Sequence, residues 1–118
     1  MAEVENIRDW QGKDVLDSAG EKIGEMEDVY FDIETDEPRF LCVKAGWLGH
    51  HVVLVPAAGV LASPDHLAVA VTKDVAEKAP AMEPGGELSA EIEARLFGYY
   101  ALDYRPAQTP GGRRLVRR

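Results

Sequence analysis

The chain has 118 residues, of which 46% are hydrophobic and 29% are charged, and its net charge at pH 7 is −8. A chain of this size and composition folds as one domain with its own core, which excludes an intrinsically disordered protein. A polar, acidic start without an apolar targeting segment, together with a single cysteine, predicts a cytoplasmic protein without an internal disulfide.

Short apolar runs of strand length follow one another along the first two thirds of the chain, separated by turn signals rich in Gly, Pro, Asp and Ser. The runs are DVLD, KIGEMEDVYFDI, RFLCVKA, HHVVLVP and LAVAVT. Because turns recur about every ten residues, we expect a small sandwich or barrel rather than strands alternating with helices. The longest apolar run, VVLVPAAGVLA, holds a proline and a glycine and is too short to cross a membrane.

The stretch 17–37 is strongly acidic, with nine acidic residues and Lys22 as its one base. Between residues 23 and 32 the apolar and polar positions change phase, so a regular strand would not bury one clean face. A bulge near Gly24 or Glu27 would restore the phase, and it would leave the glutamates on a solvated strand face.

A calcium site is the alternative interpretation of the same stretch. A calcium-binding loop that starts at Asp32 would have acidic residues at its first, third and fifth positions. It would also need glycine at the sixth position and glutamate at the twelfth, where the chain has Glu37 and Val43. We therefore predict no calcium site.

The run from Val52 to Val55 is apolar at every position, so both faces of this strand are expected to be buried. A barrel core covers one face, and the second face needs a further layer, for which a helix near the C-terminus is the candidate. Cys42 lies in another apolar run and is interpreted as a small buried hydrophobe rather than a reactive thiol.

The histidines give no metal-binding pattern. His50 and His51 are adjacent, so on a strand they point to opposite faces, and His66 belongs to a separate turn. The sequence also lacks the motifs of nucleotide-binding loops, serine hydrolases and zinc sites. We predict no catalytic residue, no metal and no cofactor.

The C-terminal third has a different character. Ser89 is a plausible helix N-cap, and residues 89–101 read as a helix in which Gly98 marks the end. We expect a β domain over residues 1–80, a linker and helix over 81–105, and a flexible tail over 106–118. The rest of the chain has a net charge of −12, and the tail adds four positive charges through Arg113, Arg114, Arg117 and Arg118.

The β segment resembles the PRC-barrel domain, over roughly residues 8–72. This domain occurs in the cytoplasmic part of the photosynthetic reaction centre H subunit and in the C-terminal half of a ribosome maturation factor, and short stand-alone bacterial members are the most similar. The resemblance rests on Gly12, Val15, Asp17, Gly20, Ile23, Gly24, Asp28, Tyr30, Asp32, Pro38 and the strand that ends at Pro56.

The resemblance implies a mainly β fold, a small twisted β-barrel, here with a C-terminal helical appendage. It implies a docking or assembly module without catalytic residues. The matching residues have structural roles: the glycines form turns and bulges, Asp28 and Asp32 make hydrogen bonds at strand ends, and Pro56 ends a strand.

The leading functional hypothesis is therefore a non-enzymatic protein-interaction module that forms a homodimer. Aromatic and apolar residues without an evident core position are the candidate interface: Trp47, Leu48, Phe97, Tyr99, Tyr100 and Tyr104. Packing of the helix on its own barrel is the alternative for the tyrosines. Two further hypotheses are a ribosome- or RNA-associated assembly factor that uses the arginine tail, and an enzyme or small-ligand binder.

Overall fold

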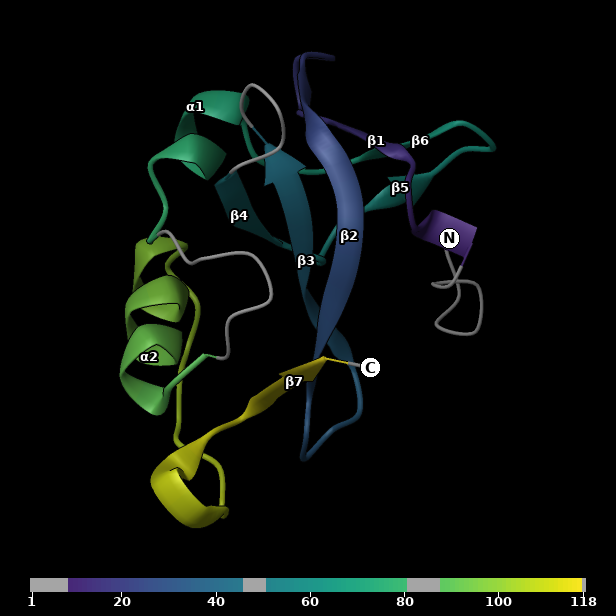
Figure 1. Ribbon diagram of the computed structural model, residues 1–118. Helices are drawn as coiled ribbons and strands as arrows, with labels where there is room; N and C mark the ends of the chain where they lie inside the picture. Colours follow the sequence, from purple (N-terminus) through teal and green to yellow (C-terminus); the bar gives the residue numbers. More distant parts are fainter. Residues whose placement is uncertain (1–8, 46–50, 81–87, 118) are drawn as a thin grey trace.

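The computed structural model of the protein describes residues 9–45, 51–80 and 88–117 (Figure 1). As expected, it is mainly β, with one mixed seven-stranded sheet and two short helices in its C-terminal half. The strands are β1 Asp14–Leu16, β2 Lys22–Asp32, β3 Pro38–Ala45, β4 His51–Pro56, β5 Leu61–Ala62, β6 His66–Ala68 and β7 Leu115–Arg117. The helices are α1 Lys73–Glu77 and α2 Ala90–Tyr99, and a short 3-10 helix, η3 Pro110–Gly112, precedes β7.

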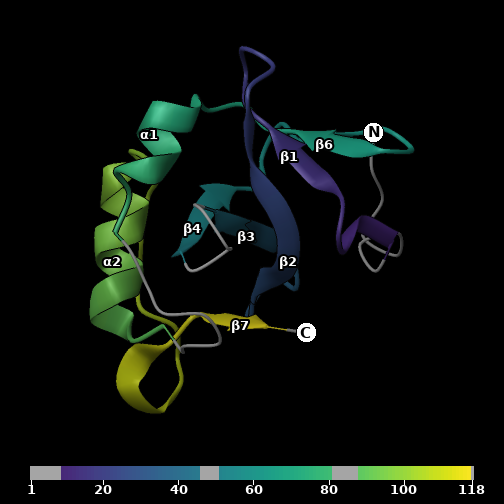
Figure 2. The same ribbon diagram turned by 45° about the horizontal axis from the view of Figure 1, so that its top comes forward.

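The strands follow the order β4-β3-β2-β1-β6-β5, and β7 also pairs with β2. Only β1 and β6 are parallel; the other pairs are antiparallel. Figures 1 and 2 show β2 as a long bent strand at the centre, with α2 along one side of the molecule and β7 crossing near one end of β2.

Strand β2 pairs with three other strands because it is long and irregular. Its 11 residues pair with β1 near one end, with β3 along most of the length and with β7 at the other end. The register with β3 slips between Met26 and Asp28, so Glu27 is the extra residue of a bulge. The register with β1 also slips beside Gly24, because Val15 pairs with Gly24 and Leu16 with Lys22. The prediction of a bulge near Gly24 or Glu27 is therefore confirmed, and it explains the phase change in the sequence.

Strand β4 is buried on both faces, as its uninterrupted apolar run predicted. Val53 and Val55 belong to the barrel core, which also holds Val15 and Leu67. On the opposite face, Val52 and Leu54 belong to a second core; its other members include Phe40, Leu88, Leu96, Phe97 and Leu115. The C-terminal helix therefore supplies the second covering layer, and it packs on its own barrel.

The C-terminal segment differs from the flexible tail that we expected over residues 106–118. Leu115 is fully buried in the second core, and β7 pairs with residues Tyr30–Asp32 of β2. The arginine-rich composition wrongly predicted a solvated tail, because acidic side chains within the fold bind Arg114. Arg118 lies outside the described residues.

Gly24 is required by a close approach of β2 to β3. A Cβ atom at this position would lie 1.9 Å from the backbone oxygen of Lys44. We predict that Gly24→Ala lowers the free energy of unfolding by about 3 kcal/mol, because the two backbones would have to separate. Urea denaturation followed by circular dichroism measures the change.

The matched control is Gly98→Ala in α2, where a Cβ atom would have no neighbour within 4 Å. Alanine is the better helix former, so this variant should be about 0.5 kcal/mol more stable than the wild type. Equal destabilisation by both substitutions would contradict the assignment of Gly24 to a close backbone contact.

Candidate functional site

Most of the predicted interface aromatics lie inside the fold. Phe97 is 1% exposed and packs edge-on against Phe40, with ring centroids 5.3 Å apart. The hydroxyl of Tyr100 donates a hydrogen bond of 2.6 Å to the carbonyl oxygen of Leu54, so it satisfies the backbone of β4. These side chains hold α2 on the barrel and do not form one exposed patch. Trp47 and Leu48 lie outside the described residues.

Tyr99 is the predicted aromatic that stays at the surface, with 39% of its area exposed. Its hydroxyl donates a 2.5 Å hydrogen bond to the carbonyl oxygen of Val75 in α1, and Val75 is also 39% exposed. The ring of Tyr99 stands edge-on to that of Tyr100, with centroids 5.0 Å apart. Tyr99 and Val75 are thus two exposed residues with apolar area on adjoining helices, α2 and α1, and we call the pair the helix-pair surface.

A buried carboxylate joins α2 to β7. Glu93 is fully buried, and its carboxylate accepts hydrogen bonds from the backbone N–H groups of Arg114 and Leu115 at 2.7–2.9 Å. It also accepts one from the hydroxyl of Tyr104 at 2.8 Å. Burial, together with this carboxylate, raises the pKa of Tyr104 to about 12, so the hydroxyl stays a donor.

The role of Glu93 was missed by sequence reasoning. The signal was present, because Glu93 lies three and four residues before Leu96 and Phe97 and so occupies the apolar stripe of the helix. A charged residue in such a stripe is buried only when other groups satisfy it. What the sequence did not show is that the satisfying N–H groups come from a segment about twenty residues away.

The side chain of Arg114 forms the second link between the C-terminal segment and the barrel. Its Nε donates to Asp32 at 2.8 Å, and one Nη donates to Glu34 at 2.5 Å. The other Nη donates to the carbonyl oxygen of Arg105 at 2.7 Å. Because Arg114 and Asp32 are both largely buried, this pair is a part of the fold rather than a surface contact. We call Glu93, Asp32, Glu34 and Arg114 the C-terminal clasp.

Asp32 also shapes the turn between β2 and β3, as predicted for a strand-end aspartate. One of its oxygens accepts hydrogen bonds from the backbone N–H groups of Glu34 and Thr35. Burial alone would raise the pKa of Asp32, but the bonds from Arg114 and from these two N–H groups outweigh it. The pKa of Asp32 therefore lies below its usual value of 3.8.

The other tail arginines that the structure describes are also bound within the chain. Nε of Arg113 donates to the carbonyl oxygen of Leu88 at 2.9 Å. Arg117 lies 3.6 Å from Asp28, the second aspartate that the family resemblance singled out. Arg114 and Arg117 therefore neutralise acids of β2 and of the turn after it rather than extending into solvent as a separate basic tail.

The remaining predicted structural residues lie in turns and strand ends. Gly12 and Gly20 have φ values of 82° and 87°, which favour glycine, and Pro56 is the last residue of β4. Asp17 accepts backbone hydrogen bonds from Ala19, Glu21 and Lys73. The bond from Lys73 contributes most to holding the pKa of Asp17 below its usual value.

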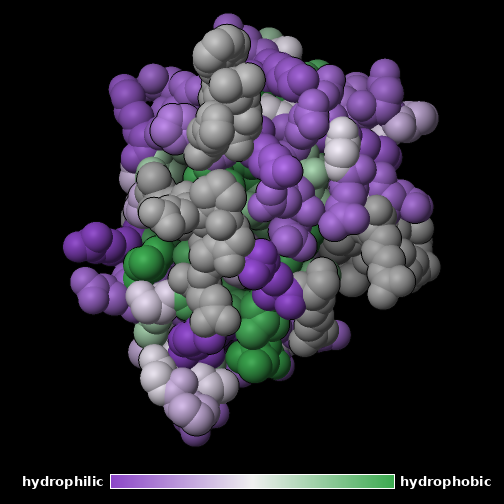
Figure 3. Space-filling view, in the orientation of Figure 1, coloured by the Kyte–Doolittle hydropathy of each residue, from purple (hydrophilic) through white to green (hydrophobic). Residues whose placement is uncertain are grey.

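The glutamates of the acidic stretch lie on a solvated face, as predicted, whereas Asp17 and Asp32 are buried. Glu25 is exposed, Glu27 lies 3.4 Å from Lys44, and Figure 3 shows hydrophilic side chains gathered over β1 and the neighbouring part of β2. Among the residues that the structure describes, no three His, Cys, Asp or Glu side chains are arranged to hold a metal ion. Cys42 is buried, and burial raises the pKa of its thiol to about 12.

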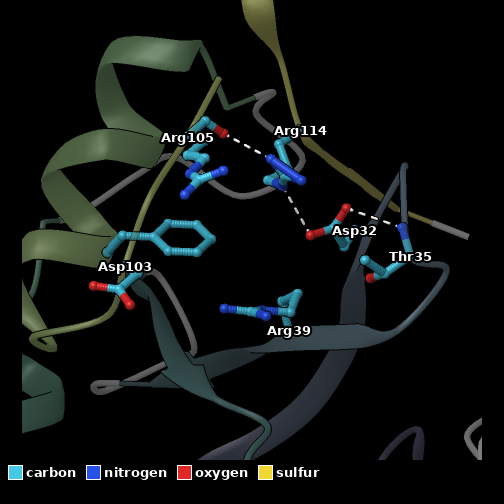
Figure 4. Close-up of a pocket in the computed structure, with 7 residues that line it drawn as sticks. Asp32, Thr35, Arg39, Asp103, Arg105 and Arg114 are labelled. Atoms are coloured by element: carbon cyan, nitrogen blue, oxygen red, sulfur yellow. Dashed lines mark hydrogen bonds and ion pairs between the residues drawn. The ribbon is translucent and has the colours of Figure 1, made fainter. Parts of the chain in front are cut away.

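A pocket of about 310 Å³ adjoins the C-terminal clasp (Figure 4). Its wall comes from the β2–β3 turn, the start of β3, α2 and the C-terminal segment. The lining residues are Asp32, Thr35, Arg39, Phe97, Asp103, Arg105 and Arg114. Sequence reasoning grouped none of these as a site, because they come from four separate parts of the chain.

Comparison with known protein families finds one match, to the PRC-barrel domain over residues 2–76. The match ends within α1, so α2 and β7 lie beyond it. Of the C-terminal clasp, Asp32 and Glu34 lie within the match, whereas Glu93 and Arg114 lie beyond it. A search of curated proteins finds no match to the chain. Neither helix in the described part of the chain is long and apolar enough to cross a membrane.

We predict that Glu93→Gln loosens β7. Glutamine keeps one acceptor oxygen but places an amide N–H₂ group against backbone N–H donors, so the free energy of unfolding should fall by about 2 kcal/mol. Hydrogen exchange at the Leu115 amide, which Glu93 binds, and at Ile33, which donates to the Arg114 carbonyl, should accelerate about tenfold or more.

Glu91→Gln on the same helix is the matched control, because Glu91 is exposed and forms only a weak ion pair with Arg95 at 3.8 Å. This variant should change stability by less than about 0.5 kcal/mol. Similar exchange rates at Leu115 in both variants would show that Glu93 does not hold β7.

The stability contribution of Asp32 should depend on pH. Because its pKa is lowered in the folded state, the contribution is fully present above the unfolded pKa and is lost as pH falls through the folded pKa. We expect Asp32→Asn to be about 2 kcal/mol less stable than wild type at pH 7. The gap in unfolding free energy should shrink below about pH 4, where the Asp32 carboxylate of the unfolded chain takes up a proton, and it should close as pH falls through the lower pKa of the folded state.

Chemical denaturation of both proteins between pH 2 and pH 7 measures this gap. Comparison of the two proteins removes the contributions of other carboxylates, including Asp17, that also lose stabilisation in acid. A gap that stays constant over the whole range would show that ionised Asp32 is not what stabilises the fold.

Proposed function

The chain belongs to the PRC-barrel domain family, and we propose that it acts as a non-enzymatic protein-interaction module that associates with itself through the helix-pair surface. The family match covers most of the barrel, but the proposed contact lies on α1 and α2, at and beyond its end. The proposal therefore rests on the physical character of that surface as well as on the family.

The observation that carries the proposal is the fixed, exposed ring of Tyr99. A tyrosine at an interface offers a large apolar area, and it loses little conformational entropy on binding when its position is already set. Here the bond to Val75 and the contact with Tyr100 set that position. Neighbouring Val75 extends the apolar area, so the helix-pair surface is suited to packing against another protein.

The use of the buried carboxylates supports the non-enzymatic part of the proposal. In the described part of the chain these are Asp17, Asp32 and Glu93. Each accepts several hydrogen bonds from backbone N–H groups, and Asp32 is also paired with Arg114. Such groups stabilise turns and the docking of β7, which is a structural role rather than an acid–base one.

The RNA-associated alternative has less support. It needs basic side chains that are free to contact phosphates, whereas Arg114 is bound to Asp32 and Glu34, and Arg117 lies against Asp28. We propose a cytoplasmic location, because the protein carries a free buried thiol and no disulfide among its described residues.

Light scattering on purified protein at several concentrations tests self-association. We expect the wild type to form a dimer and Tyr99→Ala to weaken the dimer about tenfold. Val75→Glu should separate the chains by placing a charge in the contact. This change should preserve α1, because Thr72 is its N-cap and a glutamate at the third helical position completes a capping box.

Leu61→Glu is the matched control, since Leu61 is the most exposed large apolar residue in the described part of the chain and lies on β5, away from the two helices. This variant should remain a dimer. A monomeric wild type, or dissociation by Leu61→Glu rather than Val75→Glu, would refute the proposed contact.

A further inference from the structure

We propose that the pocket beside the C-terminal clasp binds an oxyanion, the carboxylate or phosphate group of a small molecule. The inference is independent of the helix-pair surface, because the two sites share no residue. It rests on the balance of charge in the pocket, on the geometry of two arginines and on the apolar wall between them.

The charge of the pocket lining differs from the charge of the chain as a whole. The pocket is lined by three arginines and two aspartates, although the chain as a whole has a net charge of −8. Arg114 is paired with both Asp32 and Glu34, so this group has a net charge of −1. The remaining charged residues of the lining are Arg39, Arg105 and Asp103, with a net charge of +1, so the positive charge of the pocket is concentrated at Arg39 and Arg105.

Neither Arg39 nor Arg105 has an ion-pair partner among the residues that the structure describes. The guanidinium carbon of Arg39 lies 5.3 Å from the centroid of the Phe97 ring, a cation–π contact that uses the face of the guanidinium and leaves its N–H edges free. Arg105 is held through its backbone oxygen by Arg114, while its side chain is exposed. Figure 4 shows both side chains extending into the pocket from opposite walls.

The two guanidinium groups match the chemistry of an oxyanion. A guanidinium presents its N–H groups in a fork that fits the paired oxygens of a carboxylate or phosphate. Thr35 accepts a long hydrogen bond from the Glu37 N–H, so its hydroxyl proton remains available to a ligand oxygen. The ring of Phe97 gives the pocket an apolar wall, and its volume is at the lower end of the range for small-ligand sites.

Two-dimensional NMR of the full chain tests the inference. Sodium phosphate and sodium acetate are titrated separately, each against sodium chloride at the same ionic strength. We expect saturable shifts of the Thr35, Arg39 and Arg105 resonances with at least one of the two anions. Saturation with phosphate alone identifies a phosphate site, and saturation with acetate identifies a carboxylate site.

Arg39→Gln and Arg105→Gln should each raise the dissociation constant about fivefold, the loss expected for one partly exposed ion pair. Arg95→Gln on α2 is the matched control, because Arg95 is exposed and lies outside the pocket lining. This variant should bind as the wild type does. Shifts that rise linearly with both anions, or a loss in Arg95→Gln equal to that in Arg39→Gln, would overturn the proposal.

Discussion

The apolar character of both faces of β4 is the constraint on which the rest of the structure depends. A barrel core takes Val53 and Val55, but Val52 and Leu54 remain on the outside and must be kept from water. Helix α2 meets this need by placing Leu96 and Phe97 over them. The part of the chain beyond the family match is therefore a layer of the same folded unit and not an appendage to it.

Where the helical layer packs on the barrel, charged side chains lie in places from which water is excluded. The fold surrounds the carboxylate of Glu93 with backbone donors, and it pairs Arg114 with Asp32 at the end of β2. The two links meet at residues 114 and 115, so β7 is held from α2 on one side and from β2 on the other. The positive charge that this segment brings also relieves repulsion within an otherwise acidic chain.

Much of the barrel could be predicted from local patterns, because the bulge at Glu27 and the double burial of β4 leave direct traces in the order of apolar residues. The C-terminal clasp could not, because its energy comes from pairing groups that are far apart in the sequence. Composition made Arg114 look like part of a solvated tail, whereas its partner Asp32 read as an ordinary turn residue. The pocket could not be predicted for the same reason, since no sequence pattern indicates that Arg39 and Arg105 lie close together.

The position of Cys42 has a practical consequence. It is the chain's one cysteine, and it lies in the second core with Leu54 and Phe97 rather than in the barrel core. Its thiol is both covered and strongly protonated, so thiol reagents modify the protein only when this core opens. The rate of labelling therefore reports how often the second core opens, and it can be measured on the chain's own cysteine without a substitution.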